Sequence, residues 1–184
     1  MTAYPFDDYH RVYIATSIAD MSAPTLTELD EAIDITCDLT KDGLKLERNT
    51  EVITRTLWRS QLLTEFPGRY GTSGAFLKGR RRTQGDAEPL WDAAAAYRSQ
   101  AYLIVRRGLL YEVEFDGGQV VEVLRFRYGR RSIAASAGNA RVTFTVPILI
   151  DAENDAAILH GAALLAEDGS VLLEEDGEEI LLEV

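Results

Sequence analysis

The sequence contains few side chains of the types that commonly catalyse reactions or bind metals. Its two histidines, His10 and His160, have no partner at the spacing of a metal-binding motif. The single cysteine, Cys37, lies in the apolar phase of an alternating segment, which indicates a buried thiol rather than a nucleophile. A lone cysteine also excludes an intramolecular disulfide. These residues therefore predict no catalytic, metal or cofactor site.

Glycine-rich and acidic stretches offer no better site. The stretch from Gly68 to Gly74 is rich in glycine, but it lacks the lysine and the following helix of a phosphate-binding loop. No serine lies in a nucleophile elbow. The carboxylates near the C-terminus do not have the spacing of a calcium loop. We therefore expect the protein not to be an enzyme.

A basic cluster is the most distinctive chemical feature. Four cations fall within five residues of a glycine-rich stretch, at Lys78, Arg80, Arg81 and Arg82. They repel one another unless a partner screens them. Three interpretations stay open: docking on an acidic protein surface, such as another copy of this chain, a solvated loop, or contact with nucleic acid. Tyr70 and Phe76 are near enough to stack on bases, but the surrounding chain has no net charge, so docking is favoured.

Charge is distributed unevenly along the 184 residues. The formal charge is −11, and 11 of the 30 acids but none of the 19 bases lie after Arg141, so the preceding residues are balanced. This length fits one domain with an appendage. We expect a domain over residues 1–161 and an acidic extension over 162–184, in which Leu-Leu pairs and Asp-Gly turns nearly repeat.

Most of the chain has the pattern of β-strands. Alternation of apolar and polar residues predicts strands over 11–15, 33–39, 119–128 and 141–150. Runs of valine, isoleucine, leucine and aromatic residues predict strands over 102–106 and 109–115, and residues 44–58 are expected to return as a strand after the turn at 41–43. Asp-Gly pairs predict turns at 41–43 and 116–118. No apolar run approaches the ~20 residues of a membrane helix. The fold class is therefore mainly β, a sandwich or barrel.

Helical signals are few. Pro89 and Asp92 suit the first turn of a helix over residues 89–99. Thr25 and Glu28 have the spacing of a capping box that opens one helical turn. Residues 59–88 contain repeated glycines and one proline, and they are expected to form a long loop with at most a short strand at 75–78.

Several segments resemble the major tail tube proteins of long-tailed (siphovirus-type) bacteriophages, especially those of actinobacteria. The resemblance rests on Ser17-Ile-Ala-Asp20, on Ala23-Pro-Thr25 followed by Glu28, and on residues 33–43. The order of elements is also similar: a hairpin, a long loop, a single helix and a β meander. It spans roughly residues 11–150.

The resemblance implies a structural virion protein without catalytic residues or cofactors. Such proteins form homohexameric rings whose strands join across subunits into a barrel, and the rings stack into a tube that delivers DNA. The implied partners are further copies, the tape measure protein, the tail terminator and the distal tail proteins. It also implies assembly in the host cytoplasm, without a membrane. The alternatives are a tail terminator or minor tail component, and a monomeric β-barrel that binds a small apolar ligand.

Two sets of residues acquire roles from this resemblance. The long loop would stack rings through Arg69, Tyr70, Lys78, Arg80, Arg81 and Arg82, and a lumen wall would include Arg125, Arg127, Thr143 and Thr145. Bare arginines in a channel would hold phosphates and slow the DNA. We therefore expect Arg125 and Arg127 to be paired with carboxylates, with Glu112, Glu114 and Glu122 as the candidates.

Overall fold

The computed structural model describes residues 10–56, 63–82, 87–134 and 142–161, and these residues form an antiparallel β fold. The strands are β1 (His10–Ala15), β2 (Ile33–Asp34), β3 (Leu39–Thr56), β4 (Leu63–Arg80), β5 (Gln100–Arg107), β6 (Val120–Tyr128), β7 (Ser132–Ile133) and β8 (Thr143–Ile158). The helices are α1 (Leu26–Asp30), the 3-10 turn η1 (Thr36–Asp38) and α2 (Pro89–Ala93). The expected mainly-β class is confirmed.

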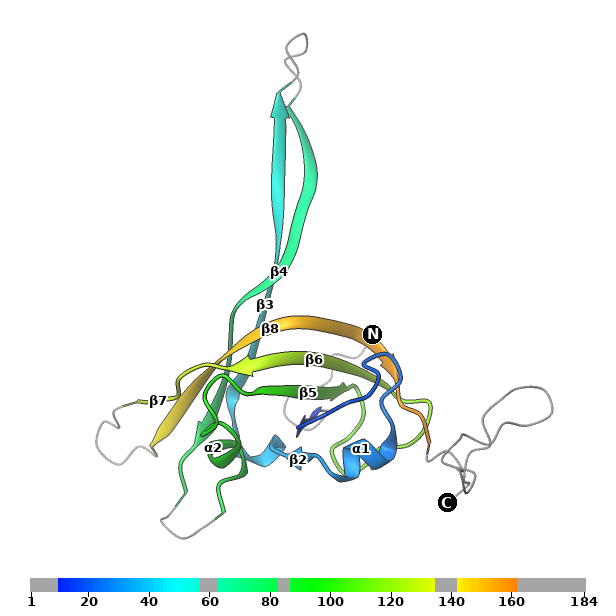
Figure 1. Ribbon diagram of the computed structural model, residues 1–184, viewed down its shortest axis with the longest axis vertical. Helices are drawn as coiled ribbons and strands as arrows, with labels where there is room; N and C mark the ends of the chain where they lie inside the picture. Colours follow the sequence, from blue (N-terminus) through cyan, green and yellow to red (C-terminus); the bar gives the residue numbers. More distant parts are fainter. Residues whose placement is uncertain (1–9, 57–62, 83–86, 135–141, 162–184) are drawn as a thin grey trace, which may run out of the picture.

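One curved sheet contains all of these strands in the order β2-β1-β5-β6-β8-β4-β3, with β7 beside β8. Strand β8 links two parts of it: its residues 143–147 pair with β4 and residues 148–158 pair with β6. In Figure 1, β5, β6 and β8 arch above α1, α2 and β2, while β3 and β4 rise away from them as a long hairpin.

Apolar side chains pack on both faces of the sheet. The inner core contains Leu103, Leu124, Phe126, Phe144 and Val146, and it is closed by α2 and the first part of β3. The outer core lies on the opposite face, where residues 16–32 cover alternate positions of β5 and β6. Both faces of the central strands are therefore buried at one end of the sheet, which explains the nearly continuous apolar runs of β5 and β6.

Several predicted elements are confirmed. Strands β1, β5 and β6 lie within two residues of the predicted ranges, and β8 continues eight residues beyond its predicted end. The capping box at α1 is present, because the Thr25 hydroxyl accepts from the amide of Glu28 and the Glu28 carboxylate accepts from the amide of Thr25. The Asp-Gly-Gly turn before β6 is also present, with Gly118 at a φ of +81°.

The predicted loop over residues 59–88 is wrong for most of its length. Residues 63–80 form β4, which pairs with β3 from Thr56↔Leu63 to Leu39↔Gly79. Glycines and a proline are tolerated here because residues 63–75 of β4 belong to a two-stranded ribbon. Among the described residues this part of β4 pairs only with β3, so its other edge makes no ladder.

The predicted turn at 41–43 is a bulge inside β3, where the register shifts between Leu39 and Leu44. A Cβ on Gly43 would lie 2.6 Å from the Lys78 carbonyl oxygen, so this close approach of two backbones requires glycine.

Residues 109–115, predicted as a strand, form a loop around Arg106. The Arg106 guanidinium is fully buried and donates to the carbonyls of Leu110 and Glu114, both at 2.9 Å. Burial lowers the pKa of Arg106. A strand would direct these carbonyls into a ladder, whereas a loop can turn them towards one buried cation.

Two further predictions fail near helices. Residues 33–39 form only the two-residue strand β2 before η1 begins, and Cys37 on η1 is exposed rather than buried. Helix α2 ends at Ala93 instead of residue 99. Residues 94–98 form turns instead, and at Arg98, with a φ of +66°, the amide donates to the Tyr128 carbonyl just before β5 begins to pair with β6.

Candidate assembly surfaces

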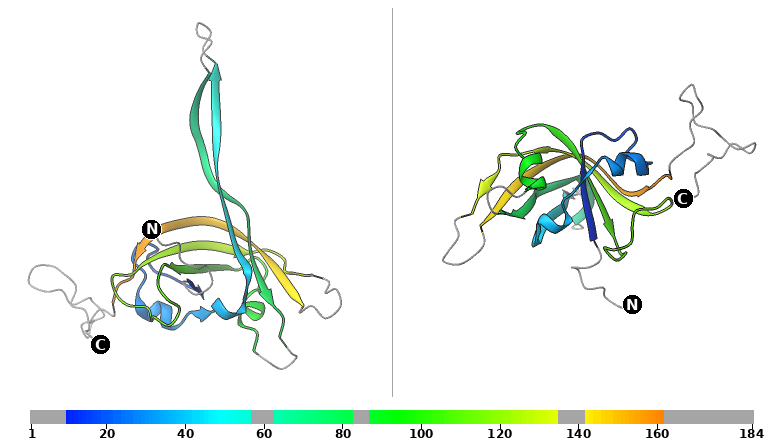
Figure 2. Two further views of the ribbon diagram at one scale, coloured as in Figure 1. Left: turned by 180° about the vertical axis from the view of Figure 1, so that it is seen from behind. Right: turned by 90° about the horizontal axis from the view of Figure 1, so that it is seen from below.

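The first candidate surface is the part of the hairpin that leaves the sheet. We call residues 47–56 of β3 and 63–73 of β4 the arm, and the remaining described residues the body. Within the described part of the chain, the arm strands pair only with each other, so both outer edges present unpaired backbone groups. The arm projects from the body in every side view (Figures 1 and 2).

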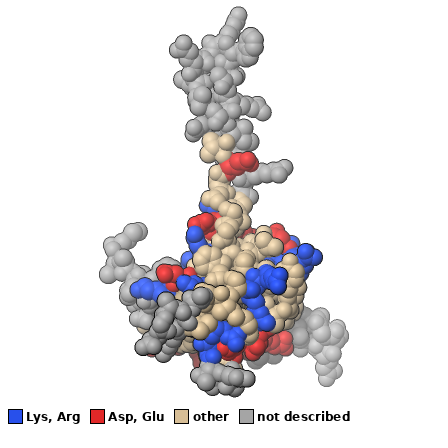
Figure 3. All heavy atoms as spheres, turned by 90° about the vertical axis from the view of Figure 1, so that its left-hand side faces the viewer, with Lys and Arg blue, Asp and Glu red and all other residues tan. Residues whose placement is uncertain are grey.

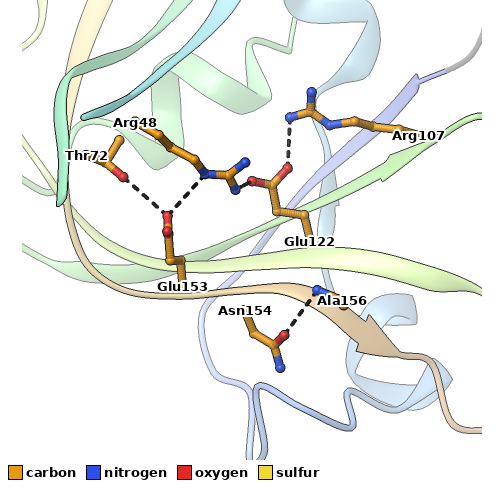
Figure 4. Close-up of polar contacts among 7 residues, drawn as sticks. All are labelled: Arg48, Thr72, Arg107, Glu122, Glu153, Asn154 and Ala156. Carbon is orange, nitrogen blue, oxygen red and sulfur yellow. Dashed lines mark hydrogen bonds and ion pairs between the residues drawn. The ribbon is translucent and has the colours of Figure 1, made fainter. Parts of the chain in front are cut away.

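A polar joint attaches the arm to the body (Figure 4). Arg48 of the arm forms ion pairs with Glu122 on β6 and, at 3.6 Å, with Glu153 on β8. Arg107 approaches the second Glu122 oxygen at 2.8 Å. The Thr72 hydroxyl donates to Glu153 at 3.2 Å. Glu122 is buried, so its two arginine partners compensate for the removal of its charge from water.

The basic cluster lies at the foot of the hairpin and not at its tip. Arg81 approaches Glu88 at 3.3 Å, and its guanidinium lies 3.8 Å from the centre of the Trp91 ring. Arg82 forms an ion pair with the buried Asp38. The screening expected from a partner is thus supplied to these two arginines by the same chain.

Of the other four residues predicted to stack one ring on the next, two lie at the foot of the hairpin and two lie on the arm. Lys78 pairs across the ladder with Thr145 of β8, and Arg80 ends β4 opposite Thr143. Arg69 and Tyr70 are on the arm, where Tyr70 pairs with Thr50. The structure therefore separates the six residues between the arm and the foot of the hairpin.

The four residues predicted to line a lumen share one face of the sheet. Arg127 lies opposite Leu149 on β8, and Thr143 and Thr145 follow the same alternation as Leu149. This is the face that the outer core covers further along β6, but at Arg125 and Arg127 it is open. Figure 3 shows basic and acidic side chains interspersed on the body below the arm.

Both arginines have a carboxylate partner, as predicted, but it is a different residue. Asp151 accepts from Arg125 Nε at 2.9 Å and lies 3.8 Å from Arg127 Nε. The hydrogen bond and the charge of Asp151 raise the pKa of Arg125. Glu122 instead belongs to the joint on the opposite face. Asp151 sits at a bulge in β8, which the period-two pattern did not indicate.

A further surface was missed in the sequence. Residues 148–158 of β8 pair with β6 on one edge, while the described residues provide no strand for the other edge once β4 departs at Phe76. Leu149 and Ile158 on this strand are 64% and 50% exposed. The joint between arm and body was missed as well, and its sequence signal was Glu122 within the apolar run of β6, since a buried carboxylate requires a cation from a neighbouring element.

The described residues hold no group of three or more histidine, cysteine, aspartate or glutamate side chains that could bind a metal. Neither α1 nor α2, each of five residues, is long enough to cross a bilayer, and no other described helix is.

Unpaired sheet edges and a projecting arm are features of a structural subunit, because exposed edges favour pairing with another chain. The chain belongs to the phage tail tube protein family, whose model matches residues 1–159. It is therefore a structural component of a phage tail, and not an enzyme.

The structure is similar to a chain in the six-fold symmetrised cryo-EM structure of the anti-feeding prophage baseplate. The TM-score is 0.56 at 13% sequence identity, and the match covers 84% of this chain and 96% of the other. At this identity the likeness concerns the fold. No curated protein matches the chain.

Proposed function

We propose that this protein is the subunit of hexameric rings that stack into the tail tube of a long-tailed phage, through which genomic DNA is delivered. The family assignment supports the tube, and the six-fold symmetrised baseplate supports the ring size by analogy of fold. Residues 1–161 form the tube domain in this proposal, and residues 162–184 extend it. Assembly takes place in the host cytoplasm with the tape measure, tail terminator and distal tail proteins as partners.

The unpaired strand edges carry the proposal. A single subunit leaves open the outer edge of β3 and the edge of β8 at residues 148–158, as judged from the described residues. Exposed edges favour pairing with another chain. A heterologous contact that closes after a rotation produces a ring, and repetition along the axis produces a filament. We therefore assign β8 and β3 to contacts within the ring.

The arm is assigned to contacts between rings. It projects from the body (Figure 1), and a two-stranded ribbon is marginally stable without further partners. In this proposal Arg69 and Tyr70 contact the adjacent ring from the arm, and Lys78 and Arg80 contribute at its foot. Arg81 and Arg82 keep the foot in place through Glu88, Trp91 and Asp38.

The face that contains Arg125, Arg127, Thr143 and Thr145 is assigned to the lumen. Asp151 lies against both arginines and reduces their attraction for phosphates. DNA would then pass without being held and without sequence-specific contacts.

Electron microscopy of the purified protein tests the assignment. We expect tubes of stacked rings from the full chain. A variant in which residues 49–71 are replaced by Asn-Gly should keep the body, give separate rings and form no tubes. Dispersed monomers from the full chain under all conditions would contradict the proposal. Single rings from the full chain would instead support a tail terminator.

A further inference from the structure

A pocket of about 660 Å³ lies between the two margins of the sheet. Strand β1 contributes His10 and Val12, and residues 39–48 at the start of β3 form the opposite wall. Strand β3 is the last strand at one end of the sheet, and β1 is the last but one at the other end, where only the two-residue β2 follows it. The pocket therefore lies where the sheet fails to close into a barrel.

The pocket has a strong excess of positive charge. Five lysine and arginine side chains line it, at Lys41, Lys45, Arg48, Arg80 and Arg107, against one lining carboxylate, Glu47. Glu47 pairs with Lys45 at 2.5 Å. Arg48 and Arg107 share Glu122, and Arg48 also lies 3.6 Å from Glu153. Three acids thus accompany the five bases, and a negatively charged occupant is favoured by the remaining positive charge.

Part of the lining is apolar. Leu39, Leu44 and Leu46 are half-buried, and they pack at the margin of the inner core beside the buried Val12. A small inorganic anion would leave these leucines in water. The pocket therefore suits an occupant that combines carboxylates with aliphatic side chains.

Residues 162–184 of the same chain have this combination. Their sequence holds eight carboxylates and no lysine or arginine, and the acids alternate with aliphatic pairs. The pairs are Leu164-Leu165, Leu172-Leu173 and Leu181-Leu182. The segment also lies outside the 1–159 range that matches the family. Charge and apolar character are therefore both complementary to the pocket.

The segment also begins close enough to reach the pocket. Register pairs place His10 opposite Arg107 and Val120 opposite Ile158, so β1 begins and β8 ends at the same end of the sheet. Residues 159–161 continue from β8 beside residues 24–26 on the side of the outer core, so the segment has to pass around the end of the sheet to reach the pocket. An extended chain covers about 3.3 Å per residue, and the segment has 23 residues, so its length is sufficient.

We propose that the acidic, leucine-rich segment 162–184 docks in the basic pocket between β1 and β3 of its own chain. The carboxylates approach Lys41 and Arg80 at the rim, and one leucine pair covers the apolar lining. The docked segment keeps the pocket cations from binding other polyanions. This inference does not depend on tube assembly.

Zero-length carbodiimide coupling of the full chain, mapped by mass spectrometry, tests the docking. The reagent joins an amine to a carboxylate in direct contact. The chain has three lysines, of which Lys41 and Lys45 line the pocket and Lys78 does not. We expect Lys41 to couple to acids within residues 167–183 several-fold more than Lys78 does, with Lys45–Glu47 coupling as an internal reference. An equal mixture of ¹⁴N and ¹⁵N chains distinguishes coupling within a chain from coupling between chains.

Two matched variants control for general charge effects. Arg80→Glu, in the pocket, should lower the Lys41 coupling several-fold, whereas Arg130→Glu, at an exposed position outside the pocket lining, should not. High salt should also lower it, since the Debye length falls to about 3 Å at 1 M. Coupling to Asp7 or Asp8, coupling mainly between chains, or Lys41 coupling no greater than that of Lys78 would each overturn the proposal.

Discussion

The body and the arm are built from the same two strands but are held by different forces. In the body, β3 and β4 contribute Leu44, Leu46 and Leu77 to the inner core. In the arm, the same strands have paired backbones, but none of the arm side chains that the structure describes, at residues 47–52 and 71–73, is buried, and Val52 is 57% exposed. Burial of apolar area stabilises the body, whereas the arm depends on its ladder and on the joint.

The hairpin therefore contains two segments of different stability. The body segment is shaped by contacts within the chain. The arm segment exposes both edges, and in the proposed tube these edges would find their partners in another subunit. Substitutions in the body should therefore affect folding, and substitutions in the arm should affect assembly. The following measurements test this division, beginning with the largest expected effect.

Phe126→Ala removes a fully buried ring from the inner core. We expect a loss of about 3–5 kcal/mol in the free energy of unfolding, because the cavity adds to the lost burial. The control Val52→Ala, in the arm, should change this free energy by less than about 0.5 kcal/mol. Urea unfolding followed by circular dichroism measures both. An equal loss in the two variants would remove the distinction between body and arm.

Gly79→Ala and Gly71→Ala compare the two segments within one strand. A Cβ on Gly79 would lie 2.6 Å from Phe144 Cζ and 2.9 Å from Leu90 Cδ2, while a Cβ on Gly71 would meet nothing within 4 Å. We expect Gly79→Ala to cost about 1–3 kcal/mol through overpacking. Gly71→Ala should stay within about 0.5 kcal/mol of the wild type. The comparison fails if Gly71→Ala destabilises as much as Gly79→Ala.

Glu122→Gln weakens the joint between arm and body. Arg48 and Arg107 lose a buried, charged acceptor, so we expect a cost of about 1–3 kcal/mol. Hydrogen exchange should also become faster in the arm amides. The control Asp151→Asn disturbs the ion pair with Arg125 on the open face, and it should leave the unfolding midpoint and arm exchange nearly unchanged. Unchanged arm exchange in Glu122→Gln would show that the joint does not order the arm.

The smallest effect concerns a loop of the body. The hydrogen bond with Cys37 and the charge of Asp34 raise the pKa of Tyr111 from 10.0 to about 12. The raised pKa means that the folded state favours the neutral phenol. The stabilisation that the neutral Tyr111 phenol gives to the folded state is present below pH 10 and is lost as the pH rises towards 12. Cys37→Ala should shift the phenolate absorbance step to lower pH, whereas Tyr97→Phe should not. An unshifted step in Cys37→Ala would show that Cys37 does not influence Tyr111.

The sequence predicts the body better than the arm. Alternation identified β1 and the second half of β6, and a run of apolar residues identified β5, because burial on one face or on both faces leaves these patterns in the sequence. Strand β4 was missed because no core imposes such a pattern on the arm, and its glycines and proline resemble those of a loop. The 41–43 turn was predicted from local chemistry, whereas the bulge depends on the position of the Lys78 carbonyl.

The site could be predicted only in part. Alternation alone placed Arg125, Arg127, Thr143 and Thr145 on one face, and electrostatics required a carboxylate near the arginines. The identity of that carboxylate, Asp151, depends on a bulge that local sequence does not encode. The partners of Arg81 and Arg82 come from residues 38 to 91, so their ion pairs are tertiary and could not be read from the basic cluster itself.

The position of β8 between β4 and β6 has a mechanical consequence. A force applied to the arm reaches β8 through the five residue pairs that join β4 to it, together with the ion pairs of Arg48. The hydrogen bonds of an antiparallel pair lie across the strands, so a pull along β4 loads them all at once. From there β8 spreads the load along β6. The short β4–β8 ladder therefore resists a pull along the arm as one unit, and β8 passes the load on to the rest of the sheet.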